Sequence, residues 1–284
     1  MSANILVTGA TGTIGQALVN ALQARGASFK IAARDVAKAR EKFGSEVSIV
    51  AFDFADSSTY APATAGVDRV FLLGPPLSLE LDTLLQPFIH YLKKHDIRRV
   101  VYLSAFGMES ISDKMPFHRN IEQQLRADDF ELTVLRPTFF AQNFKNYEWD
   151  NVIERKITYM PAGNGKTAFV DVQDIAEVAA TVLLEDGHNG KDYVLTGSES
   201  LSYYDAAALL SEVRKENIIY PNPSPEEYAQ TLQAAGAPAF IADYMNTVYG
   251  MIREGQVDHV SPHVEQLLGR KPGTLKNVLE KSFA

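Results

Sequence analysis

The sequence contains no cysteine among its 284 residues. This absence excludes disulfides, iron–sulfur clusters, thiol nucleophiles and thiolate zinc sites together. The chain also lacks any apolar run near the ~18 consecutive residues that a membrane-spanning helix needs. Its first residues show no basic region followed by an apolar core, the pattern of a signal peptide. We therefore expect a soluble, cytoplasmic protein.

Positive charge is also scarce. The chain has 27 Lys and Arg against 35 Asp and Glu, which gives a formal net charge of −8 and a pI of about 5.3. This balance disfavours a general nucleic-acid or membrane-surface binder. Hydrophobic residues make up 46%, close to the globular average, so the chain can bury a substantial core. The length suits one large α/β domain with a smaller part attached.

The first half alternates short apolar runs with helical patterns, which predicts an α/β fold with a doubly wound parallel sheet of the Rossmann type. The predicted strands are residues 4–8, 29–34, 47–54, 67–74, 98–105 and 130–137. After Pro137 the pattern becomes loop-rich, and from Ser202 onward it is mostly helical. We predict a nucleotide-binding domain over residues 1–150 that also receives 168–197. Residues 151–284 then form a smaller, mostly helical substrate-binding part.

Three glycines, Gly9, Gly12 and Gly15, lie between the first predicted strand and a helix. Small residues at this point let the backbone approach a pyrophosphate, whose charge favours the N–H groups of a helix N-terminus. No Gly-Lys-Ser/Thr follows, so a Walker-type phosphate loop is excluded. The alternative is a plain structural turn. The predicted cofactor contacts in this segment are Thr8, Gly9, Ala10, Thr11, Gly12, Thr13, Ile14 and Gly15.

The end of the second predicted strand distinguishes between dinucleotides. An acidic residue there would bind the ribose hydroxyls of NAD, whereas Arg34 matches the geometry of a 2′-phosphate, so we predict NADP(H) over NAD(H). In the alternative interpretation Arg34 is a solvated charge and Asp35 a helix cap. At the end of the third strand, Asp53 and Phe54 are predicted to contact the adenine, and the alternative for Asp53 is a turn residue.

Several segments together resemble the NmrA-like atypical short-chain dehydrogenase/reductases. They are "TGATGTIG", "DFAD", "VVYLSAFG", "FHRNIEQQL", "TVLRPTFFAQNF", "FVDVQDIAEVAA" and "YVLTGSESLSYYDAAALL". This family includes NADPH-dependent quinone oxidoreductases, triphenylmethane-dye reductases and redox-sensing transcription co-regulators. The resemblance covers nearly the whole chain. The resemblance, together with the position of the ends of strands four to six, implies further cofactor contacts. These predicted contacts are Leu73, Gly74, Pro75, Ser104, Ala105, His118, Pro137, Thr138 and Phe139.

One departure concerns the catalytic helix. Standard short-chain reductases use a Tyr-x-x-x-Lys pair in which the lysine lowers the pKa of the tyrosine, and the tyrosine works as acid or base. Counted back from Glu122, the lysine position here is His118 and the tyrosine position is Lys114. The segment is similar to the His-x-x-x-Glu pattern of the atypical branch. The resemblance thus implies hydride transfer to an acceptor that is already electrophilic, such as a quinone, a dye or an iminium ion.

Ser104 and His118 are the predicted catalytic residues, because Ser104 ends the fifth strand, where doubly wound sheets bind ligands. The alternatives are a buried strand-end serine and an ordinary polar histidine. A hydrolase triad is rejected because no Gly-x-Ser-x-Gly elbow surrounds the serine. His259 and His263 straddle a predicted helix start, so we expect no metal site.

Aromatic residues alternate with amides after Pro137, which favours a wall for flat substrates over an ordinary core stripe. The predicted substrate contacts are Phe106, Phe140, Asn143, Phe144, Met160 and Tyr244. The sequence therefore predicts an NADPH-dependent reductase of planar, electron-poor small molecules, acting as a monomer or homodimer. The alternative function is a non-catalytic NADP(H)-binding redox sensor of the NmrA type. A sugar-nucleotide epimerase is disfavoured because such enzymes keep the Tyr-x-x-x-Lys pair.

Overall fold

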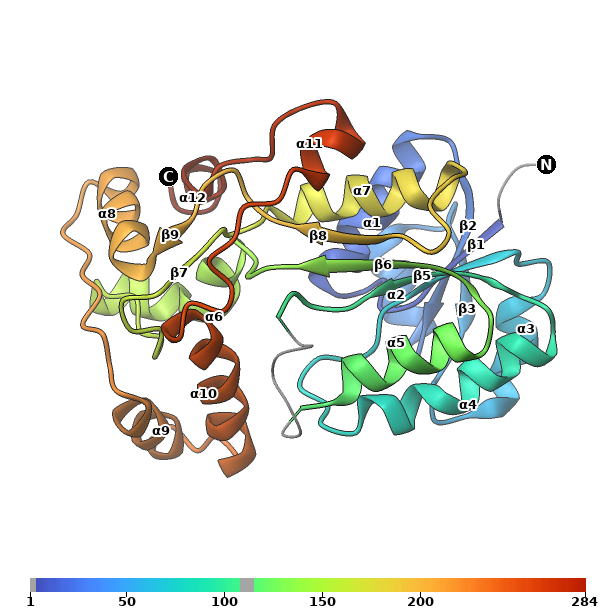
Figure 1. Ribbon diagram of the computed structural model, residues 1–284, viewed down its shortest axis with the longest axis horizontal. Helices are drawn as coiled ribbons and strands as arrows, with labels where there is room; N and C mark the ends of the chain where they lie inside the picture. The colour runs from blue at the N-terminus through green and yellow to red at the C-terminus, as the bar shows by residue number, and fades with distance from the viewer. Residues whose placement is uncertain (1–3, 108–114) are drawn as a thin grey trace. The chain divides into compact units, whose positions relative to one another are not determined.

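A computed structural model describes residues 4–107 and 115–284. Its main sheet has seven strands in the order β3-β2-β1-β4-β5-β6-β8 (Figure 1). The strands are β1 (Asn4–Val7), β2 (Ser28–Ala33), β3 (Ser48–Ala51), β4 (Arg69–Leu72), β5 (Arg99–Leu103), β6 (Glu131–Pro137) and β8 (Asp192–Leu195). β1 pairs in parallel with both β2 and β4, so the chain reverses direction across the sheet at this strand. The structure confirms the doubly wound parallel sheet predicted from the sequence.

The chain divides into two compact units. Unit 1 comprises Met1–Arg136 and Val172–Val194, and unit 2 comprises Pro137–Asp171 and Leu195–Ala284. The sequence places this boundary at residue 150 and returns 168–197 to the first part. Unit 2 begins at Pro137, the last residue of β6. Just beyond it, the Thr138 hydroxyl donates to the carbonyl of Ala168, and the N–H of Ala141 donates to the carbonyl of Val170. These bonds join the segment after β6 to the segment before α7 within unit 2.

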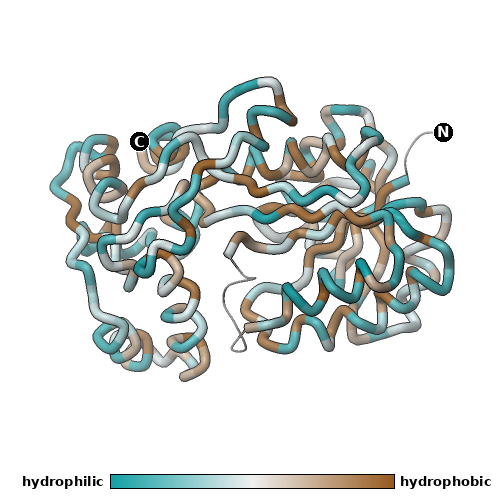
Figure 2. Tube along the Cα trace, viewed as in Figure 1, coloured by the Kyte–Doolittle hydropathy of each residue, from teal (hydrophilic) through white to brown (hydrophobic). Residues whose placement is uncertain are grey.

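Helices cover both faces of the sheet in unit 1. They are α1 (Thr13–Ala24), α2 (Val36–Phe43), η1 (Ser57–Thr59), α3 (Tyr60–Thr64), α4 (Leu81–Lys94), α5 (Phe117–Ala127) and α7 (Val172–Leu184). α1 packs against α7 on one face and α4 against α5 on the other (Figure 1). The central strands are mostly hydrophobic after their first residue, which gives the brown stretches of the tube in Figure 2, and Ile5, Leu6 and Val7 of β1 are fully buried. Burial of both faces is why these strands read as continuous apolar runs.

Unit 2 is mostly helical and carries one small sheet. Its elements are α6 (Asn143–Asp150), the π-helical η2 (Asn151–Arg155), β7 (Lys166–Thr167), β9 (Leu201–Ser202), α8 (Tyr203–Arg214), α9 (Pro225–Ala234), α10 (Ala239–Arg253), α11 (His263–Leu268) and α12 (Leu275–Phe283). β7 and β9 pair antiparallel. None of the helices within the described residues is both long and apolar enough to span a bilayer.

The prediction of a loop-rich segment after Pro137 was wrong in part, because α6 and η2 lie there. Phe144 and Glu148, four residues apart, are the buried side chains of α6. Because one of these two buried residues is a glutamate, the spacing of apolar residues alone does not indicate a helix here. Lys156 then ends η2 in a left-handed conformation (φ 56°).

Candidate functional site

The glycine turn between β1 and α1 has two glycines that the fold itself requires. Gly9 has φ 65°, a conformation that favours glycine, and a Cβ there would lie 2.8 Å from Cγ of Leu73. At Gly15 a Cβ would lie 2.2 Å from the carbonyl oxygen of Gly9 and 2.5 Å from Cα of Ala10. Only glycine at this position lets α1 pack this closely on the turn.

At Gly12 the fold itself does not require a glycine. Its φ of −79° suits any residue, and the nearest atom to an added Cβ is the Gly9 carbonyl oxygen at 3.4 Å, an ordinary contact. Thr11, Gly12 and Thr13 are exposed, Gly12 gives α1 no side-chain cap, and the first turn of α1 has no acidic residue. The space beside Gly12 at the positive end of α1 therefore fits the pyrophosphate of a dinucleotide.

Thr8 and Lys42 hold this turn in place. The Thr8 hydroxyl accepts from the N–H of Leu73 at 2.8 Å and lies 3.0 Å from the carbonyl of Phe71, so it ties the turn to the end of β4. Lys42 of α2 donates to the carbonyl of Thr11 at 2.8 Å. At Gly74 a Cβ would lie 2.4 Å from Cδ1 of Leu81, so this glycine serves the packing of α4.

The end of β2 presents Arg34 rather than Asp35. The Asp35 carboxylate accepts from the N–H of Lys38 at 2.9 Å and caps α2, as the alternative interpretation of Asp35 predicts. Arg34 is exposed and forms no hydrogen bond or ion pair with the residues that the structure describes. A guanidinium is thus the group available to a ribose phosphate at this strand end.

Asp53 and Phe54 have internal partners after β3. The Asp53 carboxylate accepts from the N–H of Ala55 at 3.0 Å, a turn role that the sequence left open. The Phe54 ring packs edge-on against Phe52 and Phe88, with centroid distances of 4.9 and 5.8 Å. Both side chains are only partly exposed, and their predicted contact with adenine stays a prediction.

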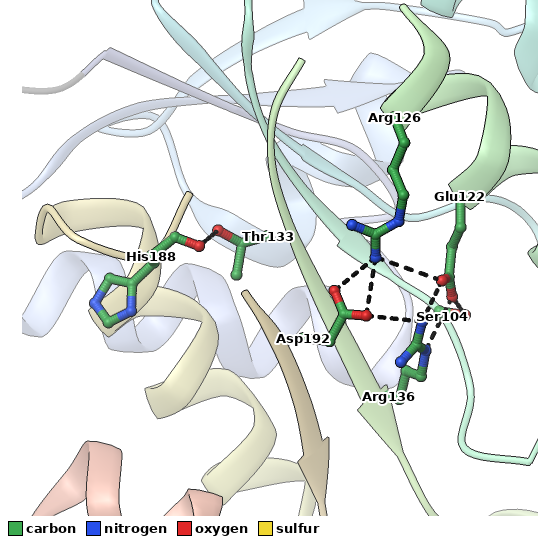
Figure 3. A network of polar contacts seen from close by, with 7 residues as sticks. All are labelled: Ser104, Glu122, Arg126, Thr133, Arg136, His188 and Asp192. Atoms are coloured by element: carbon green, nitrogen blue, oxygen red, sulfur yellow. Dashed lines mark hydrogen bonds and ion pairs between the residues drawn. The ribbon is translucent and has the colours of Figure 1, made fainter. Parts of the chain in front are cut away.

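The side chain of Ser104 contacts a network of charged side chains (Figure 3). Ser104 is 5% exposed, and its hydroxyl donates to Glu122 Oε1 at 2.7 Å. Arg136 of β6 binds both oxygens of Glu122 and lies 3.0 Å from Asp192, which also pairs with Arg126 at 2.6 Å. Ser104 is thus oriented by a buried carboxylate that is itself neutralised. The hydroxyl hydrogen points inward, so its oxygen lone pairs remain for a ligand.

His118 lies in the first turn of α5, four residues before Glu122. Its Nδ1 is 2.6 Å from the hydroxyl of Tyr102 on β5. Burial lowers the pKa of His118 to about 4, so the ring is neutral near pH 7. Lys114, the other residue named at the catalytic helix, lies outside the described residues.

The sequence reasoning missed Tyr102, Glu122 and Arg136. A signal existed, since Tyr102 and Ser104 have the two-residue spacing of one strand face. His118 and Glu122 have the four-residue spacing of one helix face. In the structure Tyr102 contacts His118, and Ser104 contacts Glu122. Predicted and missed residues therefore form one cluster.

The remaining predicted contacts divide by exposure. In unit 1, Leu73, Gly74, Pro75, Ala105 and Phe106 are partly exposed. In unit 2, Phe139, Phe140, Asn143 and Tyr244 are partly exposed, whereas Pro137, Thr138, Phe144 and Met160 are buried. Phe144 packs against Phe169 and Tyr203, with centroids 5.3 and 5.5 Å away. The structure places these two predicted wall residues, Phe144 and Met160, in the core of unit 2.

Unit 2 also buries a carboxyl group. Glu148 is 2% exposed, and its Oε2 accepts from the Thr158 hydroxyl at 2.6 Å and from the N–H of Tyr159 at 2.8 Å. Oε1 has no hydrogen-bond partner among the described residues. Burial raises the pKa of Glu148 to about 7, against the two hydrogen bonds that lower it.

Glu148→Gln is expected to stabilise the protein above pH 7. The folded state favours the protonated acid, so its contribution is fully present below about pH 4.5 and is lost as the pH rises to about 7. The shift corresponds to about 3 kcal/mol, which the neutral amide would recover at pH 8 but not at pH 4.5. Urea unfolding at both pH values measures this difference.

The matched control is Glu216→Gln, also in unit 2. Lys156 pairs with Glu216 at 2.7 Å and lowers the pKa of this partly exposed carboxyl group, so its charged form is favoured in the folded state. Glu216→Gln is therefore expected to lower the stability slightly at pH 8 rather than raise it. An unfolding free energy of Glu148→Gln that keeps the wild-type pH dependence would contradict the assignment of this group.

Comparisons with known proteins show the family and the fold of this chain. A model described as the NmrA-like family matches residues 1–279. An NAD(P)H azoreductase of Xenophilus azovorans is 32% identical over 274 residues, which cover 95% of this chain and 94% of that protein. The crystal structure of Citrobacter sp. triphenylmethane reductase complexed with NADP(H) has a TM-score of 0.85 at 25% identity, covering 98% of this chain and 99% of that one. NADPH-dependent quinone oxidoreductase from Escherichia coli, solved with NADPH, has a TM-score of 0.90 at 24% identity, covering 99% of this chain and 100% of that one, and so shares the fold.

Proposed function

The chain belongs to the NmrA-like family, and from this premise we propose that it is an NADPH-dependent oxidoreductase that reduces a planar, electron-poor small molecule. Quinones, dyes and iminium ions are the acceptor classes that fit. The name of the Xenophilus relative, an NAD(P)H azoreductase, and the NADP(H) complex of the Citrobacter dye reductase support the coarse reaction class.

The observation that carries the proposal is that Gly12 and Arg34 are both available to a ligand. Gly12 is a glycine that the fold does not need, at the positive end of α1, and Arg34 is an exposed guanidinium with no partner in the described residues. A pyrophosphate and a 2′-phosphate are the groups that would use these two features. Asp35, the acidic alternative for NAD, already caps α2.

The reaction we propose does not use the Tyr-x-x-x-Lys relay. No tyrosine anywhere in the sequence is followed four residues later by a lysine. When bound, NADPH supplies the hydride. Ser104 and His118 orient the reacting groups, Ser104 through oxygen lone pairs and His118 through a neutral ring nitrogen. A neutral imidazole is a weak acid, which suits acceptors that are already electrophilic and need orientation more than protonation.

Unit 2 contributes partly exposed rings to the proposed substrate contacts, those of Phe140 and Tyr244. Flat, apolar faces of this kind bind conjugated molecules by stacking and edge contacts. Asn143 adds an amide that can fix the orientation of a carbonyl or amine.

A binding titration followed by an acceptor panel tests the proposal. NADPH and NADH affinities are measured by fluorescence, and NADPH oxidation is then followed against quinones, dyes and imines. We expect tighter binding of NADPH than of NADH and turnover of at least one acceptor class. Tight NADPH binding without turnover of any acceptor would favour the redox-sensor alternative and reject the reductase.

Arg34→Ala is expected to weaken NADPH binding by about 10- to 100-fold and to leave NADH binding unchanged, since a hydrogen bond to a charged group contributes about 1.5–3 kcal/mol. The same titration measures both affinities. Arg40→Ala is the control, because Arg40 is an exposed arginine of α2 whose side chain donates to the carbonyl of Ser45. Equal losses for NADPH and NADH would remove the argument for the 2′-phosphate.

A further inference from the structure

Tyr102 is a buried phenol whose hydroxyl meets the histidine of the proposed site. It lies on β5, is fully buried, and its Oη is 2.6 Å from Nδ1 of His118. Two side chains on α4 and α5, Asp82 and Glu122, are the charged groups whose field reaches this phenol. Tyr102 and His118 are 16 positions apart in the chain, so only the packing of α5 on the sheet brings them together.

The direction of this hydrogen bond follows from the other partners of each group. A tyrosine hydroxyl can donate or accept, and a neutral imidazole has one nitrogen of each kind. If Nδ1–H donated to Oη, the phenolic hydrogen would need another acceptor. The structure records no other partner for this hydroxyl among the described residues, and a buried O–H without a partner costs about 1–3 kcal/mol. Tyr102 therefore donates, and Nδ1 accepts.

We propose that Tyr102 is a positioning residue that holds His118 in the Nε2–H form, so that His118 presents a hydrogen-bond donor to the substrate or to the nicotinamide ribose. Burial raises the pKa of Tyr102 well above 10, which keeps its proton available. The lowered pKa of His118 keeps the ring from taking up a second proton. His118 Nε2 has no partner within the described residues.

The neighbouring pair, Ser104 and Glu122, leaves a hydrogen-bond acceptor for a ligand instead of a donor. Ser104 donates its hydrogen to Glu122 and leaves oxygen lone pairs, whereas His118 accepts from Tyr102 and leaves an N–H. The two pairs thus present one acceptor and one donor in a fixed arrangement. This inference rests on the proposed function, because it assigns His118 its part in orienting the reacting groups. Fixed donors need no reorganisation during reaction.

Tyr102→Phe tests the inference because it removes only the hydroxyl. In the cofactor-free protein, nitrogen NMR of the His118 ring is expected to show an unprotonated, hydrogen-bonded Nδ1 and a protonated Nε2. In Tyr102→Phe the Nδ1 resonance is expected to move toward that of a nitrogen without a hydrogen bond. His118→Ala identifies the signals. With NADPH and a benzoquinone, kcat is expected to fall about 10-fold, the lower end of the effect known for partners that orient metal-ligating histidines, while the NADPH Kd changes less than twofold.

A double variant separates this role from a general loss of packing. If Tyr102 acts through His118, Tyr102→Phe changes kcat less than twofold in a His118→Ala background. The matched control is Tyr193→Phe, since Tyr193 also bonds a histidine Nδ1, that of His188, at 2.8 Å in the same unit. This control is expected to keep the wild-type kcat and the wild-type His118 signals.

Three results would overturn the inference. They are a protonated Nδ1 in the wild-type protein, His118 resonances that do not move in Tyr102→Phe, and a full kcat loss that persists without His118. Thermal unfolding of each variant shows whether the fold is intact. If the wild-type protein reduces no acceptor, the proposed function fails, whereas the His118 resonances still decide the position of the proton.

Discussion

Gly12→Val is expected to weaken NADPH binding by at least about 100-fold while the protein stays folded. The backbone of Gly12 suits valine, and the nearest atom to an added Cβ is 3.4 Å away, an ordinary contact. We expect the new side chain to fill the space beside the N-terminus of α1. Overpacking of about 3 kcal/mol against a bound phosphate corresponds to this loss of affinity. Replacing glycine at the helix N-cap costs about 1 kcal/mol of stability or less.

Gly15→Ala is the contrasting variant at the same turn. Its methyl group would lie 2.2 Å from the Gly9 carbonyl oxygen, so α1 or the turn must shift. We expect the free energy of unfolding to fall by about 1–3 kcal/mol or more, and NADPH binding to fall with it. Urea unfolding and NADPH fluorescence titration of both variants separate the ligand role from the structural role. Wild-type affinity in Gly12→Val would show that no phosphate approaches this residue.

Glu122→Ala is expected to destabilise unit 1 by about 1–3 kcal/mol, because it removes the acceptor of Ser104 and one of the two carboxylates that pair with Arg136, while Asp192 still neutralises the arginine. Glu122 is 9% exposed, and Arg136 is bound to both of its oxygens. Glu122→Leu combined with Arg136→Met is expected to recover most of the loss, since an apolar pair of similar volume replaces the buried ion pair. Urea unfolding at pH 7 measures both.

The comparison variant is Glu212→Ala, which breaks an exposed pair with Lys276. The side chains of Lys276 and Glu212 are 40% and 60% exposed, so the cost of Glu212→Ala is expected to be much smaller than that of Glu122→Ala. Equal costs for the two variants would mean that the network at Ser104 is no stronger than this surface pair. The position of Ser104 would then need another explanation.

The sheet and the glycine turn were predictable because their signals are local. The six predicted strands are apolar runs bounded by helices, and each overlaps an observed strand of the parallel sheet. β8 is the seventh strand, which the sequence analysis also assigned to the first domain. The strand–glycine–helix order around Gly9 to Gly15 needs no distant partner. The capping box at Ser224, with Pro225 at the start of α9, also depends only on residues close to one another in the sequence.

The failures involve residues that depend on distant partners. α6 was missed because Glu148 occupies a core position of this helix, and its partners Thr158 and Tyr159 come 10 and 11 residues later. Phe144 and Met160 stay predicted substrate contacts, and the packing of unit 2 buries both side chains, which the sequence did not indicate. Whether an aromatic residue lines a core or a pocket is a matter of neighbours, which periodicity does not specify.

The sequence by itself determined the doubly wound sheet, the glycine turn between β1 and α1 and the arginine at the end of β2, because strand period, helix start and glycine placement are local properties of the chain. Only the tertiary structure decided that Asp35 is a cap, that Ser104 donates to Glu122 and that Tyr102 meets His118. The last two bonds join side chains 16 to 18 positions apart in the chain, on a strand and a helix. The direction of a hydrogen bond depends on every partner within reach, and folding alone brings those partners together.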